Sequence, residues 1–117
     1  MDATAKKMSK IIDELFFFFF SVGSDDIKLD VKKKKEGYEL QLESNYDPSQ
    51  YKKVADLDKF LNVTKKNEGL EEFFWQLAGV STLGQDSELH LIGQMIDRVK
   101  LDIRENMVKM VLFKKLD

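Results

Sequence analysis

Five consecutive phenylalanines, Phe16–Phe20, stand near the start of this chain and limit how it can fold. They follow apolar residues at the i, i+3, i+4 spacing of a helix: Met8, Ile11, Ile12 and Leu15. The spacing predicts an N-terminal helix that ends near Gly23, a residue suited to the position just past a helix. Five residues cover more than one helical turn, so this helix is apolar on every side and must be covered on every side.

The helical periodicity divides the phenylalanines among faces. Phe16 and Phe19 continue the core stripe, whereas Phe17 and Phe20 face away from it and Phe18 points to one flank. Either the rest of the domain or a second chain must therefore cover the outer residues. Clustered exposed aromatic side chains mark contact surfaces. The aromatic residues that lie off the apolar stripes of their helices are our candidate interface residues: Phe17, Phe20 and Trp75.

Apolar and charged residues alternate over residues 27–43, with a turn in the middle, and this pattern predicts a β-hairpin with one buried face. A register that places Val31 opposite Leu40 also places Lys32 opposite Glu39. The same register therefore matches apolar residues with apolar residues and positive charges with negative ones.

A second hairpin is predicted at residues 99–113, with a turn at Glu105-Asn106. Val111 and Phe113 add apolar groups to the second face of its last strand. A strand that is apolar on both faces is expected to be the more central one of the pair, or to have its second face covered.

Helices are predicted between the two hairpins. Asp47-Pro48 is typical of a helix start, and the apolar stripe of that helix comprises Val54, Leu57, Phe60 and Leu61. Two more helices are predicted over residues 70–78 and 89–96. The order αββαααββ indicates a single α+β domain, residues 1–117. We expect a two-layer sandwich in which a four-stranded, largely antiparallel sheet carries the helices on one face.

The composition excludes several classes of function. The 117 residues contain no cysteine, which excludes disulfides and thiolate metal sites and suits a reducing compartment. The net charge is −2, with acids and bases interspersed, so we expect no nucleic-acid partner. Acids interrupt the apolar stretch 11–22, which is also too short for a bilayer, so we expect no membrane span and a cytoplasmic location.

Candidate catalytic groups are few. His90 is the single histidine and falls on the polar side of its predicted helix, near Asp97 and Glu88. A surface histidine is the simpler interpretation, and an enzyme that uses His90 ranks last among our hypotheses. The loop Gly79–Gly84 has the glycine spacing of a phosphate-binding loop, but Gln85-Asp86 replaces the Lys-Ser/Thr that binds phosphate and Mg²⁺. We expect neither a metal nor a cofactor.

The run Glu14-Leu15-Phe16-Phe17-Phe18, the later Gly23 and the two hairpins together resemble the nucleotide-binding domain of the GHKL ATPases, the group of histidine kinases, gyrase and chaperones. The resemblance extends from about residue 11 to 116 and is one of pattern. It implies a helix that leads into a hairpin, a lid, another helix and a final hairpin.

The resemblance also shows which functional residues of that family are replaced. Glu14 matches the general-base glutamate, but Phe18 stands where an Asn would bind Mg²⁺ and cannot bind a hard cation. Ser44 falls near the position of the adenine-reading Asp, Asn45 follows it, and Tyr46 takes the place of the next Gly. The resemblance therefore implies a vestigial pocket at Glu14, Phe18, Ser44 and Asn45, without ATPase or kinase activity.

The leading hypothesis is a bacterial, non-enzymatic regulatory or protein-interaction domain with a degenerate GHKL-like fold that forms a homodimer or binds a protein partner. The alternative is a small-ligand or nucleotide-binding domain with a rewired pocket. Its polar contacts would come from Glu14, Ser44 and Asn45.

Overall fold

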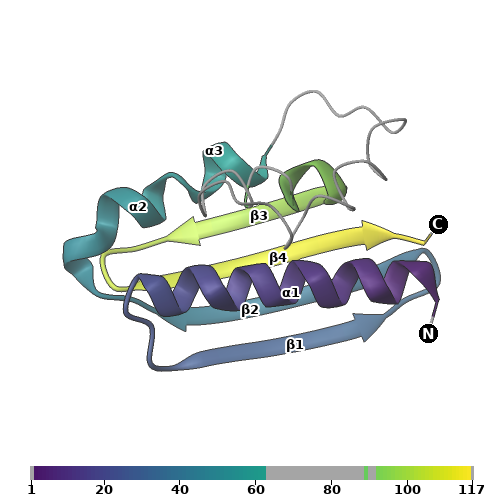
Figure 1. Cartoon of the computed structure of the whole chain (residues 1–117), viewed down its shortest axis with the longest axis horizontal. Helices are drawn as coiled ribbons and strands as arrows, with labels where there is room; N and C mark the ends of the chain where they lie inside the picture. Colours follow the sequence, from purple (N-terminus) through teal and green to yellow (C-terminus); the bar gives the residue numbers. More distant parts are fainter. Residues whose placement is uncertain (1, 63–88, 90–91, 117) are drawn as a thin grey trace.

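A computed structural model of the chain describes residues 2–62, 89 and 92–116 (Figure 1). Its elements, in chain order, are helix α1 (Ala3–Ser21), strands β1 (Ile27–Lys33) and β2 (Gly37–Asn45), the 3-10 turn η1 (Pro48–Gln50), helices α2 (Tyr51–Ala55) and α3 (Leu57–Leu61), and strands β3 (Arg98–Ile103) and β4 (Met107–Lys115). The predicted α+β class is confirmed.

The four strands form one antiparallel sheet with the order β1-β2-β4-β3. The two hairpins therefore join through their second strands, which places β2 and β4 inside and β1 and β3 at the edges. The predicted register of the first hairpin is confirmed, because Val31 pairs with Leu40 and Lys32 with Glu39. The prediction that the last strand is central is also confirmed, since β4 lies between β2 and β3.

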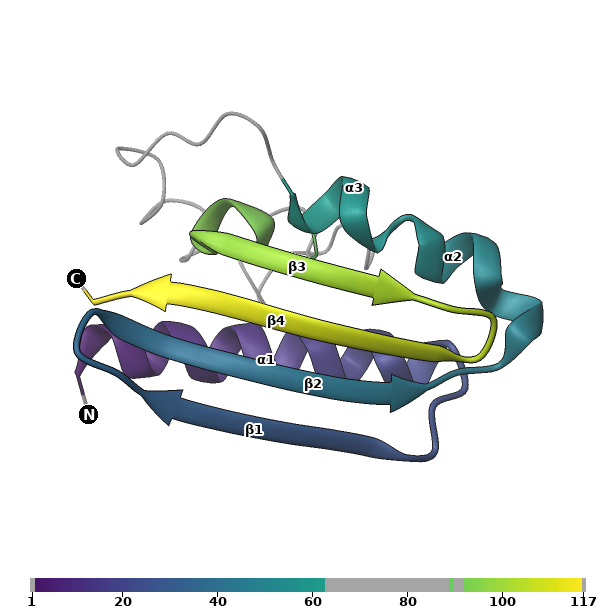
Figure 2. The same ribbon diagram turned by 180° about the vertical axis from the view of Figure 1, so that it is seen from behind.

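Helix α1 runs along one face of the sheet, in front of it in Figure 1 and behind it in Figure 2. It packs mainly on the two inner strands, β2 and β4. The short helices α2 and α3 lie on the β3 side of the molecule (Figures 1 and 2). The largest fully buried side chains come from α1, β2, α3, β4 and the segment before β3: Ile11, Leu15, Phe18, Phe19, Leu40, Leu57, Leu61, Leu89, Ile92, Met95, Ile96 and Met110.

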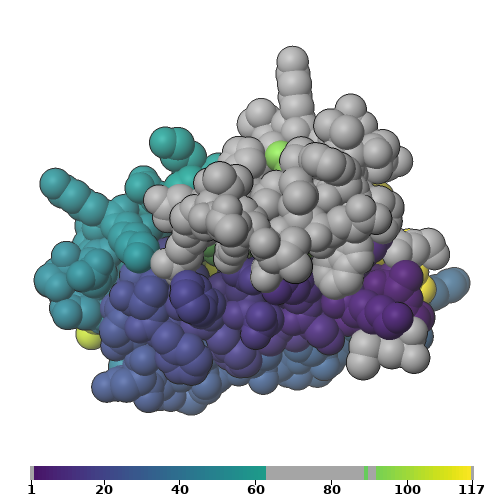
Figure 3. Space-filling view, in the orientation of Figure 1, coloured from purple at the N-terminus to yellow at the C-terminus, as the bar shows by residue number. Residues whose placement is uncertain are grey.

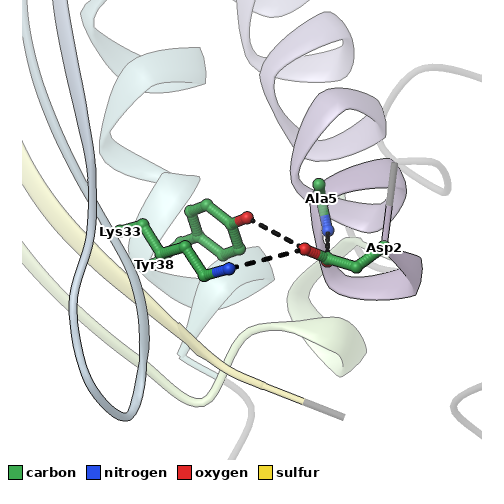
Figure 4. A network of polar contacts seen from close by, with 4 residues as sticks. All are labelled: Asp2, Ala5, Lys33 and Tyr38. Atoms are coloured by element: carbon green, nitrogen blue, oxygen red, sulfur yellow. Dashed lines mark hydrogen bonds and ion pairs between the residues drawn. The ribbon is translucent and has the colours of Figure 1, made fainter.

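The N-terminus of α1 is capped by Asp2, whose carboxylate accepts a hydrogen bond of 2.7 Å from the backbone N–H of Ala5. The same carboxylate accepts a bond of 3.3 Å from the Tyr38 hydroxyl and lies 3.8 Å from Lys33 Nζ (Figure 4). The backbone hydrogen bond from Ala5 contributes most to a lowered pKa of the Asp2 carboxyl, with smaller contributions from Tyr38 and Lys33. One side chain thus caps the helix and ties it to the first hairpin.

The C-terminus of α1 ends as the sequence predicts. Gly23 has a φ of 84°, a left-handed conformation that L side chains rarely adopt, and the next N–H, that of Ser24, bonds to the Phe19 carbonyl at 3.0 Å. A Cβ at Gly23 would also lie 3.0 Å from the Asp47 Cβ. Glycine is therefore required here both by backbone conformation and by a close neighbour.

The region after β2 differs in detail from the single helix predicted there. Asp47 is the predicted N-cap and accepts from the N–H of Ser49 at 3.0 Å, but it opens the 3-10 turn η1, and the helical chain is then interrupted at Asp56. Aspartate is unfavourable inside a helix because its side chain can form hydrogen bonds with nearby backbone groups in non-helical conformations. The predicted stripe still faces inward, since Val54, Leu57 and Leu61 are buried.

The predicted helix over 70–78 and the loop Gly79–Gly84 lie outside the described residues. Of the last predicted helix, residues 92–95 are helical, and four members of its apolar arc are buried: Leu89, Ile92, Met95 and Ile96.

Candidate functional site

The outer face of α1 carries two exposed phenylalanines. Phe17 is 60% exposed and Phe20 is 65% exposed, and they stand one helical turn apart. The Phe16 ring lies beside the Phe20 ring, with 6.2 Å between the centroids, so the three rings form one aromatic surface. Figure 3 shows α1 as a ridge across this side of the molecule. We call Phe16, Phe17 and Phe20 the aromatic surface of α1.

The inner part of the phenylalanine run belongs to the core. Phe18 and Phe19 are fully buried, and their rings meet edge to face with 5.3 Å between the centroids. Phe16, which the helical stripe assigns to the core, is half-buried on the flank of α1 instead. The core stripe is therefore rotated toward Phe18, because α1 sits at an angle on the sheet that the sequence pattern does not specify.

Glu14 is buried on the same side of α1 as Phe18 and forms an ion pair with Lys10, with 3.0 Å between the Lys10 Nζ and a carboxylate oxygen. Lys10 Nζ also lies 3.7 Å from the Asp13 carboxylate. The i, i+4 spacing of Lys10 and Glu14 stabilises the helix locally. The candidate general base thus has a partner on its own helix.

Asn45 holds the turn between α1 and β1, and Ser44 bonds to Asn45. The Asn45 side-chain oxygen accepts from the backbone N–H groups of Asp25 and Asp26 at 3.0 and 3.1 Å. The Asn45 carbonyl accepts from the hydroxyls of Ser24 and Ser44, the latter at 2.8 Å. The hydrogen-bonding capacity of both candidate pocket residues is therefore directed to the fold.

Tyr46 is buried, and its hydroxyl donates a hydrogen bond to the carbonyl of Arg104 in the β3–β4 turn. Burial raises the pKa of this hydroxyl, and the charges of Tyr51 and Glu105 raise it further. Tyr46 thus links the end of β2 to the second hairpin from the position where the GHKL pattern has Gly.

The outer face of the sheet is the second surface of the molecule, and sequence reasoning did not single it out. A row across all four strands reads Lys28, Glu43, Lys109 and Asp102, so positive and negative charges alternate between neighbours. Four residues further along the β3–β4 pair, the Arg98 guanidinium stacks over the Phe113 ring at 4.5 Å from its centroid. Three shallow hollows lie on this face, lined by residues such as Lys28, Glu43, Glu39 and Phe113. The register predicted for the first hairpin contains one pair of this row, Lys28 opposite Glu43. The other two pairs depend on the β2–β4 and β3–β4 pairing of the folded sheet.

The remaining candidates lie partly outside the described residues. Trp75, Glu88 and His90 are not among them. Asp97 accepts from the N–H of Lys115 at 2.7 Å, a contact that joins the start of β3 to the end of β4. Within residues 2–62, 89 and 92–116, no group of three or more His, Cys, Asp or Glu side chains is placed to hold a metal ion. In the same part of the chain, no helix combines the length and apolar character that a membrane span requires.

Comparison of the chain with protein-family models, with curated proteins and with solved structures found no match.

Proposed function

We propose that this protein is a non-enzymatic regulatory or protein-interaction domain that self-associates through the aromatic surface of α1. The exposure of Phe17 and Phe20, 60% and 65%, is the observation that carries the proposal. Burying the part of these two side chains that is still exposed is worth about 1–2 kcal/mol each, roughly 60–65% of the value for full burial. Aromatic side chains are also enriched at the energetic centres of interfaces.

A second copy is the occupant that suits this surface best. The charges next to the rings are already paired within the helix, as Lys10 is with Asp13 and Glu14, so an apposed copy meets few unpaired charges. Two copies of α1 that cross about a two-fold axis would place aromatic rings against aromatic rings. Trp75 belongs to the same proposal as a further contact residue.

The proposal includes a degenerate GHKL-like fold without nucleotide chemistry, in the cytoplasm of a bacterium. Two observations support the loss of the nucleotide site. Phe18 is fully buried where that family needs a metal-binding Asn, and Tyr46 is committed to the carbonyl of Arg104. The cysteine-free composition supports the cytoplasmic location.

Light scattering across a concentration series tests the proposal. The double variant Phe17→Ser/Phe20→Ser keeps the helix, because Ser and Phe have similar helix propensities. We expect it to lower the average mass relative to the wild type. The matched control is Tyr51→Ser, which removes an aromatic side chain that is 48% exposed on α2, and it should leave the mass unchanged. An unchanged mass in the double variant would overturn the proposed contact.

Calorimetric titration with ATP, ADP and GTP, with and without Mg²⁺, tests the proposed loss of nucleotide binding. We expect no saturable binding. Saturable binding that depends on Glu14, Ser44 or Asn45 would favour the alternative, a nucleotide-binding domain with a rewired pocket.

A further inference from the structure

Strand β1 forms one edge of the sheet, on the side away from α2 and α3 (Figures 1 and 2). Among the described residues, β2 is the only strand paired with it. An edge strand presents backbone N–H and C=O groups that can pair with another strand. The side chains of β1 determine which strand can pair there.

The hydrogen-bond pattern of the hairpin shows which backbone groups point to the open edge. The N–H of Lys34 bonds to the Gly37 carbonyl at 2.7 Å, and the N–H of Asn45 bonds to the Asp26 carbonyl at 3.3 Å. Since the bonds of an antiparallel pair alternate, the even-numbered residues of β1 are bonded to β2. The N–H and C=O groups of Ile27, Leu29 and Val31 therefore point outward.

The sequence of β1 is complementary to itself about Leu29. In an antiparallel pairing of two copies with Leu29 opposite Leu29, Ile27 faces Val31 and Lys28 faces Asp30 of the second copy. One step further out, Asp26 faces Lys32. The apolar residues are also those with outward-pointing backbone groups, so they form the hydrogen-bonded pairs, and every charge on the outer face meets an opposite charge.

Other registers and the other edge lack this complementarity. Centring the pairing on Asp30 instead would place Asp30 opposite itself and Lys28 opposite Lys32. Strand β3 contains the same Lys-Leu-Asp triplet at residues 100–102, but its self-pairing about Leu101 would place Arg98 opposite Arg104. A mixed pairing of β1 with β3 would bring together Lys32 and Arg98. Like charges in these positions are destabilising, so the charges select β1 with β1.

The inner face of β1 is apolar and incompletely covered. Val31 is 38% exposed, and Ile27 and Leu29 are half-buried, because α1 packs mainly on the two inner strands. A second copy at this edge would cover the apolar side chains that α1 leaves open.

The flank of α1 above this edge is apolar as well. Ile12 and Phe16 are half-buried and, at ~100° per residue, point about 180° and 140° away from Ser21. The Ser21 hydroxyl lies 3.4 Å from Lys53 Nζ of α2, so the opposite flank of α1 faces the β1 side. Backbone groups, charges and apolar side chains at this edge thus all suit the same occupant.

From the self-complementary edge of β1, we propose that two copies of this chain pair antiparallel about Leu29 and form a continuous eight-stranded sheet. The pairing rests on the proposed self-association and adds a second contact surface, distinct from Phe17 and Phe20. Two different two-fold contacts in one chain build assemblies larger than a dimer. Removing either contact alone therefore leaves a dimer, and removing both leaves a monomer.

The experiment uses the full chain carrying Phe17→Ser/Phe20→Ser, so that the β1 contact acts alone. Into this background Lys28→Asp and Asp30→Lys are introduced separately. Each change replaces both Lys28–Asp30 contacts of the dimer by like-charge contacts, and we expect dimerisation to weaken about tenfold or more. When the two variants are mixed, the aspartates of one chain face the lysines of the other. We expect a one-to-one heterodimer with the affinity of the background chain, identified by native mass spectrometry and sedimentation.

The matched control is Lys100→Asp, the same substitution in the Lys-Leu-Asp triplet of β3. Its neighbour on β4 is the uncharged Val111, and we expect the dimer to persist. Lys28 instead faces Glu43 on β2, so Lys28→Asp also creates a like-charge pair within its own chain. Asp30 faces the uncharged Gln41 across the hairpin and lies 3.5 Å from Lys32 Nζ of its own strand, an exposed ion pair of small value, so Asp30→Lys acts mainly on the dimer. Melting curves of each variant check that the fold is kept.

The outcomes separate the two proposals. A background chain that is already monomeric, or variants that dimerise alone as well as mixed, would overturn the β1 pairing and leave the aromatic contact standing. A background chain that assembles like the wild type and becomes monomeric with Asp30→Lys would support the β1 pairing and overturn the aromatic contact. Restoration of the dimer only in the mixture confirms the antiparallel register about Leu29.

Discussion

Replacing Phe18 and Phe17 by Ala, one at a time, tests how the structure divides the phenylalanine run. The two substitutions remove the same atoms from neighbouring positions of α1 and change helix propensity equally, so the difference between them isolates burial. Phe18 is fully buried, and Phe→Ala in a core costs about 3–5 kcal/mol. Phe17 is 60% exposed, which leaves about 40% of the ~1.5–3 kcal/mol of full burial, or about 0.6–1.2 kcal/mol.

Alanine's higher helix propensity, about 0.5 kcal/mol over Phe, offsets much of the Phe17 loss. The same gain applies at Phe18 and cancels in the difference, so we expect Phe18→Ala to lower the free energy of unfolding by about 2–4 kcal/mol more than Phe17→Ala does. Urea unfolding followed by far-UV circular dichroism measures both, at a concentration where the wild type is dissociated. If Phe18→Ala does not fold, Phe18→Leu gives a smaller loss in the same direction. Equal losses for the two sites would refute the assignment of Phe18 to the core and Phe17 to the surface.

Three further predictions concern two glycines in constrained positions and the N-cap of α1. Gly23→Ala should cost about 1–2 kcal/mol in urea unfolding, because its φ is 84° and the new Cβ would crowd Asp47; an unchanged midpoint would contradict this. Gly37→Ala should cost about 2 kcal/mol and increase amide exchange at the start of β2, since its Cβ would collide with the Lys114 carbonyl and break about two ladder hydrogen bonds. Full protection there would refute it. Asp2→Ala should lower the melting temperature at neutral pH. The pKa of the Asp2 carboxyl is lower in the folded chain than in the unfolded chain. The stability that Asp2 contributes is therefore fully present above its unfolded pKa and is lost as the pH falls through its folded pKa. A difference in melting temperature that persists unchanged at about pH 2 would argue against this.

The local parts of the fold could be predicted from the sequence because they depend on near neighbours. The register of the first hairpin follows from alternation and charge, as in Lys32 opposite Glu39. The end of α1 at Gly23 follows from the rarity of left-handed backbone in other residues. The outward orientation of Phe17 and Phe20 follows from the helical period.

The division of the helix after β2 was not predictable from its apolar stripe. Val54 and Leu57 are buried as the stripe indicates, yet the helix breaks between them at Asp56. Asp56 keeps right-handed helical angles, with φ −75° and ψ −8°, so the break is a local change that periodicity, which reports only the residues facing the core, does not register. The outcome for the candidate pocket was equally unpredictable, because the role of Asn45 depends on a turn about 20 residues earlier in the chain.

The phenylalanine run marks the boundary between what the sequence by itself determines and what the tertiary structure decides. The helical period alone determines the angles among the five side chains and shows that they cannot all share one face. It leaves open how far the whole helix is rotated on the sheet. Packing on the inner strands β2 and β4 settles that rotation: Phe18 is buried and Phe16 moves to the flank. Strand β1 shows the same division. Its self-complementary order of side chains can be read from the sequence, whereas its place at the edge of the sheet depends on how the two hairpins join. Burial and edges depend on neighbours that are distant along the chain, and only the folded structure brings those neighbours together.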